Sequence, residues 1–221
     1  MCGVLGQVRW EPAEDQLTRL EPALLNMAHR GPDGQGTAQI SIGTSSLTLG
    51  HTRLSIVDLT DGGKQPMFSE DGQFCLIYNG EIYNYIELRQ ELRELGCNFI
   101  SESDSEVLLK AWMTWGPDSL TKFIGMFAFA ILDQQARTLT LARDAFGIKP
   151  LYYSYSDSLF SFGSEIPALL DIGDDSPIID WSTVYNFLVT GSYDVADRTF
   201  LAIYTDCVQL HSSQSIWLPK K

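Results

Sequence analysis

The stretch MFAFAILDQQARTLTLARDAFGIKPLYYSYSDSLFSF, residues 126–162, decides the fold. It predicts consecutive strands at Met126–Leu132, Thr138–Ala142, Leu151–Tyr155 and Leu159–Phe162, separated by short turns. Strands that follow one another through short turns pair antiparallel, because a parallel pair needs a long crossover connection. Further strands are predicted at Gly3–Val8, Ser46–Asp58 and Gln73–Tyr78.

Helices are fewer than strands and are marked by their ends. We expect helices from Pro22 to about Arg30, from Tyr85 to Leu95, from Ser103 to a stop at Gly116, and from Asp180 to Leu188. The string Ser-Asp-Ser-Glu at 103–106 matches a capping box, and Gly96 and Gly191 suit the left-handed residue after a helix. Few helices among many antiparallel strands predict an α+β fold.

Net charge, the length of the apolar runs and the spacing of the cysteines each disfavour a class of function. The 221 residues include 15 basic and 28 acidic side chains, a net charge of −13, which disfavours nucleic acid and anionic membranes as partners. The apolar runs are far shorter than the ~20 residues that span a bilayer, and the N-terminus does not resemble a secretory signal. The four cysteines form no CxxC pair, so we expect no metal site, free thiols and a cytoplasmic location.

Cys2 is the first candidate for chemistry, because removal of the initiator Met1 would leave its thiol beside its own α-amine. A free α-amine has a pKa of ~7.7–8.0 and can act as the base for a nucleophile. Gly3 would let the backbone pass close to a substrate. The alternative is a buried cysteine that starts a strand, and Cys2 taken alone favours that alternative.

Seven motifs in a fixed order favour a catalytic Cys2 over a buried cysteine that starts a strand. They are MCGVLGQ (1–7), HRGPDGQG (29–36), LGHTRLSIVDL (49–59), YNGEIYNY (78–85), ESDSEVLL (102–109), GMFAFAILD (125–133) and ARDAFGIKPLYYS (142–154). Together they closely resemble the glutamine-hydrolysing domain of asparagine synthetases, a class II glutamine amidotransferase with the N-terminal-nucleophile (Ntn) hydrolase fold. The resemblance covers about residues 2–170 and implies a four-layer αββα sandwich of two antiparallel sheets.

The resemblance assigns roles in binding the two ends of the amino acid. Arg53 matches the family arginine that binds the α-carboxylate of glutamine, for which a planar guanidinium is better suited than an ammonium. Asp104 matches the acid that receives the α-ammonium. Without the resemblance, Arg53 would be a surface arginine on an edge strand and Asp104 a first-turn acid stabilised by the helix dipole. For Asp104 both interpretations can hold.

The resemblance also assigns an oxyanion site. Asn79 and Gly80 match the pair whose side-chain amide and backbone N–H stabilise the tetrahedral intermediate, although Asn-Gly is also a common hairpin turn. The same comparison places Glu81 at the α-amino end of the substrate. The side of the pocket is expected at Leu54, Ser55, Ile56 and Val57. His51 has the strand parity of Arg53, but we favour a buried, hydrogen-bonded histidine over a Cys–His dyad because the family uses the terminal amine.

The implied reaction is attack by the Cys2 thiolate on the glutamine δ-carbonyl, loss of ammonia, and hydrolysis of the γ-glutamyl thioester to glutamate. This half needs no metal or cofactor, and ATP and Mg²⁺ are expected only if a synthetase domain is present elsewhere. The chain lacks the Ser-Gly-Gly-x-Asp-Ser loop of that domain. We therefore expect an amidotransferase domain at 1–190 and a linker, or the start of a missing ATP-dependent synthetase domain, at 191–221. The expected partners are L-glutamine and that synthetase domain, in cis or in trans. A homodimer is a further possible assembly.

Three interpretations of function stay open. The first is an active glutaminase that supplies ammonia to a synthetase domain. The second is a catalytically idle glutamine-binding or regulatory module, which predicts a lost nucleophile or a broken clamp, whereas Cys2, Arg53 and Asp104 are all present. The third is an Ntn hydrolase of another amide, which is disfavoured because Arg53 and Asp104 together select a free α-amino acid.

Overall fold

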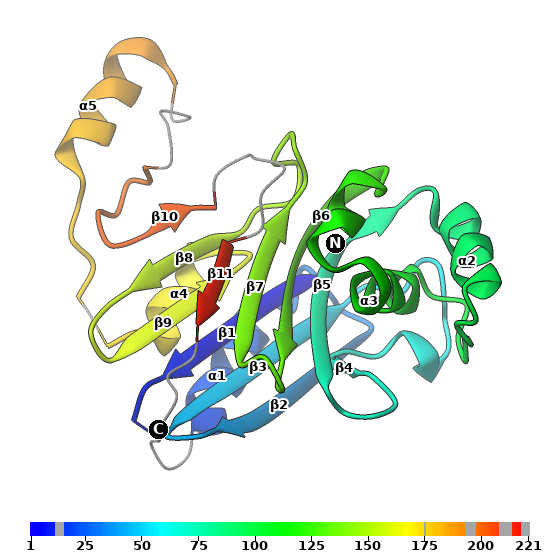
Figure 1. Cartoon of the computed structure of the whole chain (residues 1–221). Helices are drawn as coiled ribbons and strands as arrows, with labels where there is room; N and C mark the ends of the chain where they lie inside the picture. The colour runs from blue at the N-terminus through cyan, green and yellow to red at the C-terminus, as the bar shows by residue number, and fades with distance from the viewer. Residues whose placement is uncertain (12–15, 175, 193–197, 208–213, 218–221) are drawn as a thin grey trace.

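Two antiparallel sheets form the centre of the computed structural model, which describes residues 1–11, 16–174, 176–192, 198–207 and 214–217 (Figure 1). The first sheet has the strand order β10 (Thr205–Asp206), β8 (Tyr152–Tyr155), β9 (Leu159–Gly163), β1 (Gly3–Arg9), β3 (Ser45–Arg53) and β2 (Gly34–Ile42). The second has the order β11 (Gln214–Trp217), β7 (Thr138–Arg143), β6 (Gly125–Asp133), β5 (Phe74–Ile82) and β4 (Met67–Phe68). β1, which begins directly after Cys2, and β5, which carries Asn79, Gly80 and Glu81, are interior strands.

Helices cover the outer faces of both sheets. Helices α1 (Gln16–Asn26) and α4 (Ile166–Ile172) pack on the first sheet around Leu5. On the second sheet, α2 (Tyr85–Glu94) and α3 (Asp104–Trp115) pack around Phe129. Alternating apolar residues of the two sheets, Val4 and Ile77 among them, fill the space between the sheets. This arrangement is the predicted α+β, four-layer αββα sandwich.

Short-range signals placed most helix ends correctly. The Ser103 hydroxyl accepts a hydrogen bond from the Glu106 N–H at 3.2 Å and begins α3, as the capping box predicts. Asp180 caps α5 (Trp181–Thr190), which Figure 1 shows apart from both sheets. Gly96 and Gly191 take the left-handed φ values of +92° and +71° expected after α2 and α5. Two 3₁₀ turns, η1 (Asp61–Gly63) and η2 (Gly116–Thr121), complete the helical elements of the described residues.

The helix predicted from Pro22 to Arg30 was wrong at its start. Helix α1 begins at Gln16 and contains Pro22, whose ring lies on the exposed face. The buried positions Gln16, Leu20 and Leu24 are four residues apart, so burial of this face outweighs the hydrogen bond that proline cannot make. After Asn26 the chain continues in tight turns to Gly31.

Two features of the first half of the chain also differ from expectation, and one alternative interpretation is excluded. Strand β2 was not predicted, because its sequence GQGTAQISI has few large apolar residues and it lies at the edge of its sheet. The strand predicted over Ser46–Asp58 ends at Arg53, and the residues that follow form a loop. Asn79 and Gly80 lie inside β5, paired with Ala128 and Phe127, so they do not form the alternative hairpin turn.

Strands β10 and β11 extend the two sheets with residues from the segment predicted to be a linker. Parts of that segment, at 193–197, 208–213 and 218–221, lie outside the described residues. The boundary at residue 190 stays a prediction. Within the described ranges, no helix combines the length and apolarity required to cross a membrane.

Candidate active site

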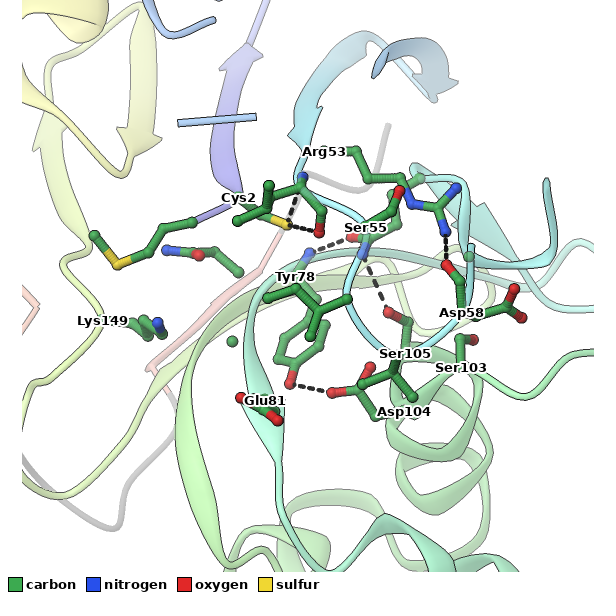
Figure 2. A pocket seen from close by; sticks show the side chains of 18 of the residues that line it. Cys2, Arg53, Ser55, Asp58, Tyr78, Glu81, Ser103, Asp104, Ser105 and Lys149 are labelled. Carbon is green, nitrogen blue, oxygen red and sulfur yellow. Dashed lines mark hydrogen bonds between the residues drawn. The ribbon is translucent and has the colours of Figure 1, made fainter. Parts of the chain in front are cut away.

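One cavity of about 160 Å³ collects every site residue that the sequence predicts. Its lining includes Cys2, Arg53, Leu54, Ser55, Ile56, Val57, Asn79, Gly80, Glu81 and Asp104. They come from the start of the chain, the end of β3 with its following loop, strand β5 and the start of α3. Figure 2 shows Arg53 and Asp58 on one side of this cavity, Lys149 on the opposite side and Cys2 between them. The volume is below the ~300–1,000 Å³ typical of drug-sized ligands and suits a small metabolite.

Cys2 lies immediately before β1, and its thiol faces the backbone of Leu54 across the cavity wall. The Leu54 N–H donates to Sγ at 3.4 Å, and Sγ lies 3.6 Å from the Leu54 carbonyl oxygen. Burial raises the pKa of the Cys2 thiol, while the Leu54 N–H, the chain's α-amine and Arg53 act to lower it. Met1 also lines the cavity, with 55% of its surface exposed. The thiol is therefore accessible but protonated in this form of the chain.

A buried arginine that the sequence analysis did not single out fixes the position of Cys2. The Arg30 Nε donates to the Cys2 carbonyl oxygen at 2.9 Å, and its Nη1 forms an ion pair with Glu165 at 2.8 Å. Arg30 is only 8% exposed, so this pairing is held in a largely dehydrated environment. Arg30 belongs to the motif HRGPDGQG, but Glu165 lies 135 residues away, and only the fold brings the two together.

Arg53 is the last residue of β3, and its guanidinium is held by the loop that follows. Nη1 donates to the Thr60 carbonyl oxygen at 2.8 Å, and Nη2 donates to the Asp58 carbonyl oxygen. The Asp58 carboxylate stabilises this loop by accepting from the Thr60 N–H and hydroxyl at 2.7 and 2.6 Å. A Cβ at Gly63 would lie 2.3 Å from Nη2 of Arg53, so only glycine leaves room for the guanidinium there. The cation thus faces the cavity without a carboxylate partner among the described residues.

Asp104 is the first residue of α3 and is also part of the cavity wall. Its Oδ2 accepts from the Tyr78 hydroxyl at 2.8 Å and from the Ile82 N–H at 3.1 Å (Figure 2). Burial is the main cause of a raised pKa for Asp104, and the neighbouring charge of Glu81 raises it further. Both interpretations of this residue, as a first-turn helix acid and as a member of the site, agree with its position.

Asn79 has the most unusual environment of the site. The residue is 1% exposed, and neither Oδ1 nor Nδ2 has a hydrogen-bond partner in the described chain. Buried amides are normally hydrogen-bonded, so an unpaired amide in a cavity wall is suited to a ligand. Beside it, a Cβ at Gly80 would lie 2.4 Å from the Met126 carbonyl oxygen, which excludes a side chain.

His51 is separate from this chemistry, as expected. It is 1% exposed, its Nε2 lies 3.0 Å from the Tyr78 carbonyl oxygen, and it does not line the cavity. Burial lowers its pKa to about 4, so the ring is neutral near pH 7. Cys75 is a buried core residue, and burial raises its pKa to about 12. Neither side chain is suited to act on a ligand in the cavity.

Two more residues that the sequence analysis did not select also line the cavity. Gln65 accepts from the Tyr78 N–H at 2.6 Å and donates to the Ser105 hydroxyl at 3.2 Å, which links β5 to α3. Lys149, from the loop after β7, is 5% exposed. Both were missed because nothing local in the sequence shows that they approach Cys2. Among the residues described, no three His, Cys, Asp or Glu side chains are grouped so as to hold a metal ion.

The two-sheet αββα sandwich, with a cysteine just before an interior strand and its thiol facing a cavity lined by charged side chains, is the fold of the Ntn hydrolases. A solved structure of this fold, the glutamine phosphoribosylpyrophosphate amidotransferase from Bacillus subtilis, is 23% identical with a TM-score of 0.64, covering 78% of this chain and 44% of that chain. The glutamine amidotransferase domain family matches residues 1–220, and the chain belongs to this family.

Curated relatives give the same assignment. Two asparagine synthetases [glutamine-hydrolyzing] of Bacillus subtilis, numbers 1 and 3, are 40% and 38% identical over 181 and 186 residues. These matches cover 80% and 81% of this chain. The chain spans only 28% and 29% of those relatives. The similarity therefore concerns one domain of a longer protein.

Proposed function

We propose that this domain hydrolyses L-glutamine to glutamate and ammonia through a thioester on Cys2. The observation that carries the proposal is the convergence on one cavity of a thiol, a cation, two carboxylates and an unpaired amide. Glutamine requires this set, because it offers an α-carboxylate, an α-ammonium and a side-chain amide whose carbonyl oxygen becomes negative during attack.

Binding would use the two charged ends of the substrate. The Arg53 guanidinium, already held by the carbonyl groups of Asp58 and Thr60, presents its free face to the α-carboxylate. Asp104 and Glu81, both in the cavity wall, receive the α-ammonium. A substrate cation beside Asp104 would offset the burial that raises its pKa, so binding and ionisation of Asp104 support each other. The backbone from Leu54 to Val57 forms the side of the site.

Catalysis would begin once Met1 is removed and the α-amine belongs to Cys2. That amine takes the thiol proton, directly or through water, and the thiolate attacks the δ-carbonyl carbon. The amide of Asn79 and the N–H of Gly80 stabilise the negative oxygen. The intermediate expels ammonia as a proton returns to the leaving nitrogen, and water then hydrolyses the thioester.

The reaction as drawn uses only groups of this chain and water, so the proposal calls for no metal or cofactor. The ammonia would be passed to an ATP-dependent synthetase domain, in cis or in trans, and ATP with Mg²⁺ would enter only there. Support for this partner is the similarity to asparagine synthetases, of which the chain spans about a quarter. The four free thiols fit a cytoplasmic location. Light scattering would measure whether the chain is a monomer or a homodimer.

The test is release of glutamate from glutamine by the chain that begins at Cys2, without ATP. Cys2→Ala should abolish turnover but still bind glutamine, which calorimetry measures. If the chain starting at Cys2 binds glutamine and never releases glutamate, it is an idle binding module. Turnover of simple amides without an α-amino group, at the rate of glutamine, would instead identify a hydrolase of a different substrate class.

A further inference from the structure

Lys149 places a cation in the cavity of the nucleophile, and the proposed mechanism does not use it. It is 5% exposed and lines the same cavity as Cys2 (Figure 2). Its ammonium forms no hydrogen bond or ion pair with any part of the chain that the structure describes. The ammonium nitrogen is not itself fully buried, so it reaches the cavity surface and is free to interact with a charge that forms there.

The loop that carries Lys149 is built to hold its position. Asp144 is 2% exposed, and its Oδ1 accepts from the N–H groups of Phe146 and Ile148 at 3.1 and 2.9 Å. Its Oδ2 accepts from the N–H groups of Lys149 and Phe127 at 3.1 and 3.2 Å. One buried carboxylate therefore organises the turn from 144 to 149 and ties it to β6.

Arg143, the residue before Asp144, holds the same turn through its side chain. Its Nε donates to the Lys149 carbonyl oxygen at 2.6 Å and its Nη2 to the Gly147 carbonyl oxygen at 2.7 Å. Gly147 has a φ of +62°, a conformation that glycine adopts without strain. The backbone of Lys149 is thus fixed on both its N–H and its carbonyl side, which sets the direction of its side chain.

The charged side chains around Cys2 differ in whether they already have a partner. Two cations and three carboxylates line the cavity, the carboxylates being Asp58, Glu81 and Asp104. Arg53 is committed to the Asp58 and Thr60 carbonyl groups, and Arg30, next to the cavity, is paired with Glu165. Lys149 is the cation near Cys2 that is left without a partner in the described residues. A thiolate would add one more negative charge to this site.

We propose that Lys149 is a positioning residue that supplies the positive charge needed to form the Cys2 thiolate, and that the turn around Asp144 serves to aim it. A neighbouring cation favours the thiolate over the thiol, as in other reactive cysteines. Burial is the main cause of a lowered pKa for Lys149, and Arg30 lowers it further, whereas the negative charges of Cys2, Glu81 and Asp144 act to raise it. Ammonium and thiolate therefore stabilise each other.

The experiment measures alkylation of Cys2 by iodoacetamide as a function of pH, using the chain that begins at Cys2 and peptide mass mapping to follow this thiol. In Lys149→Met, a neutral side chain of similar length, the midpoint should rise by about one pH unit and the rate at pH 7 should fall about tenfold. Lys149→Arg should restore most of the rate. The matched control is Lys110→Met, which removes another mostly buried lysine, paired with Glu70 at 3.0 Å and outside the cavity.

Thermal unfolding of the same variants separates charge from packing. Lys149→Met should leave the Tm nearly unchanged, because the ammonium has no partner in the described chain to lose, while Lys110→Met changes only stability. Lys149→Gln is a second neutral variant in case the Met variant does not fold. An unchanged alkylation midpoint in either folded neutral variant, or a lower Tm without a midpoint shift, would overturn the proposal. The inference rests on the proposed function, but alkylation needs no glutamine, so failure of one can be told from failure of the other.

Discussion

Replacing Asn79, whose side-chain amide is unpaired in the described chain, should separate an effect on kcat from an effect on the free energy of unfolding. Asn79→Leu keeps the branched shape of the side chain and removes both polar atoms. Because Oδ1 and Nδ2 are buried without partners in the described chain, folding leaves them unsatisfied, at about 1–3 kcal/mol for such a group. The free energy of unfolding should therefore stay equal or rise by up to about that amount. Loss of one oxyanion donor should lower kcat by about 10²–10³, with little change in KM.

The assay is glutamate release by the chain starting at Cys2, together with urea unfolding of the same preparation. Asn84→Leu is the control, because the Asn84 Nδ2 donates to the Lys122 carbonyl oxygen and its Oδ1 accepts from the Ile124 N–H, both at 2.9 Å. That variant should lose about 1–3 kcal/mol of stability and keep its kcat. Wild-type kcat in Asn79→Leu, or a loss of stability like that of Asn84→Leu, would refute the oxyanion assignment.

Three further predictions concern charge. Arg53→Lys should lower kcat/KM about ten- to a hundredfold, because it removes a charge-assisted contact with the substrate. The control is Arg93→Lys, at an exposed arginine outside the cavity. Equal kcat/KM values for the two variants would remove Arg53 from the site. Burial raises the Asp104 pKa, so kcat/KM should fall as pH drops through that raised value, and Asp104→Asn should lose this limb of the pH profile. The ionised Asp104 also destabilises the fold above its folded pKa, so the variant should be no less stable at pH 7; a clear loss would contradict this. His51 has a pKa of about 4 in the folded chain and ~6.5 in the unfolded chain. The free energy of unfolding should therefore fall by about 3 kcal/mol between pH 6.5 and pH 4, because the unfolded chain binds the proton more tightly. In urea titrations, His51→Gln should remove this part of the pH dependence.

The sequence predicted features that depend on local chemistry. The capping box at Ser103 and the left-handed Gly96 each involve residues within a few positions, and both were placed correctly. Pro22 misled, because its local preference for a first turn is outweighed by the buried face of α1, which depends on packing against the sheet. Strand β2 depends on pairing with β3 and has little apolar pattern of its own.

The candidate site follows the same division. Motif resemblance selected residues that the structure brings to one cavity, including Arg53 and Asp104, which are far apart in sequence. It did not find the pair of Arg30 and Glu165, which are 135 positions apart, nor Lys149, which only the fold brings to the cavity of Cys2. A sequence shows which side chains are present, whereas the position of Lys149 in the cavity, without a partner among the described residues, is a property of the fold.

The central claim is that the α-amine of Cys2 is the base, and the N-terminus tests it most directly. Strand β1 begins at Gly3, and Met1 is 55% exposed at the cavity, so the fold should be nearly indifferent to the loss of Met1. The measurement is glutamate release by a cleavable N-terminal fusion before and after cleavage to Cys2, with intact mass to define each terminus. The account predicts equal Tm values and activity only in the chain that begins at Cys2. If the fused or Met1-retaining protein hydrolyses glutamine equally fast, the terminal amine is not the base and the account is contradicted.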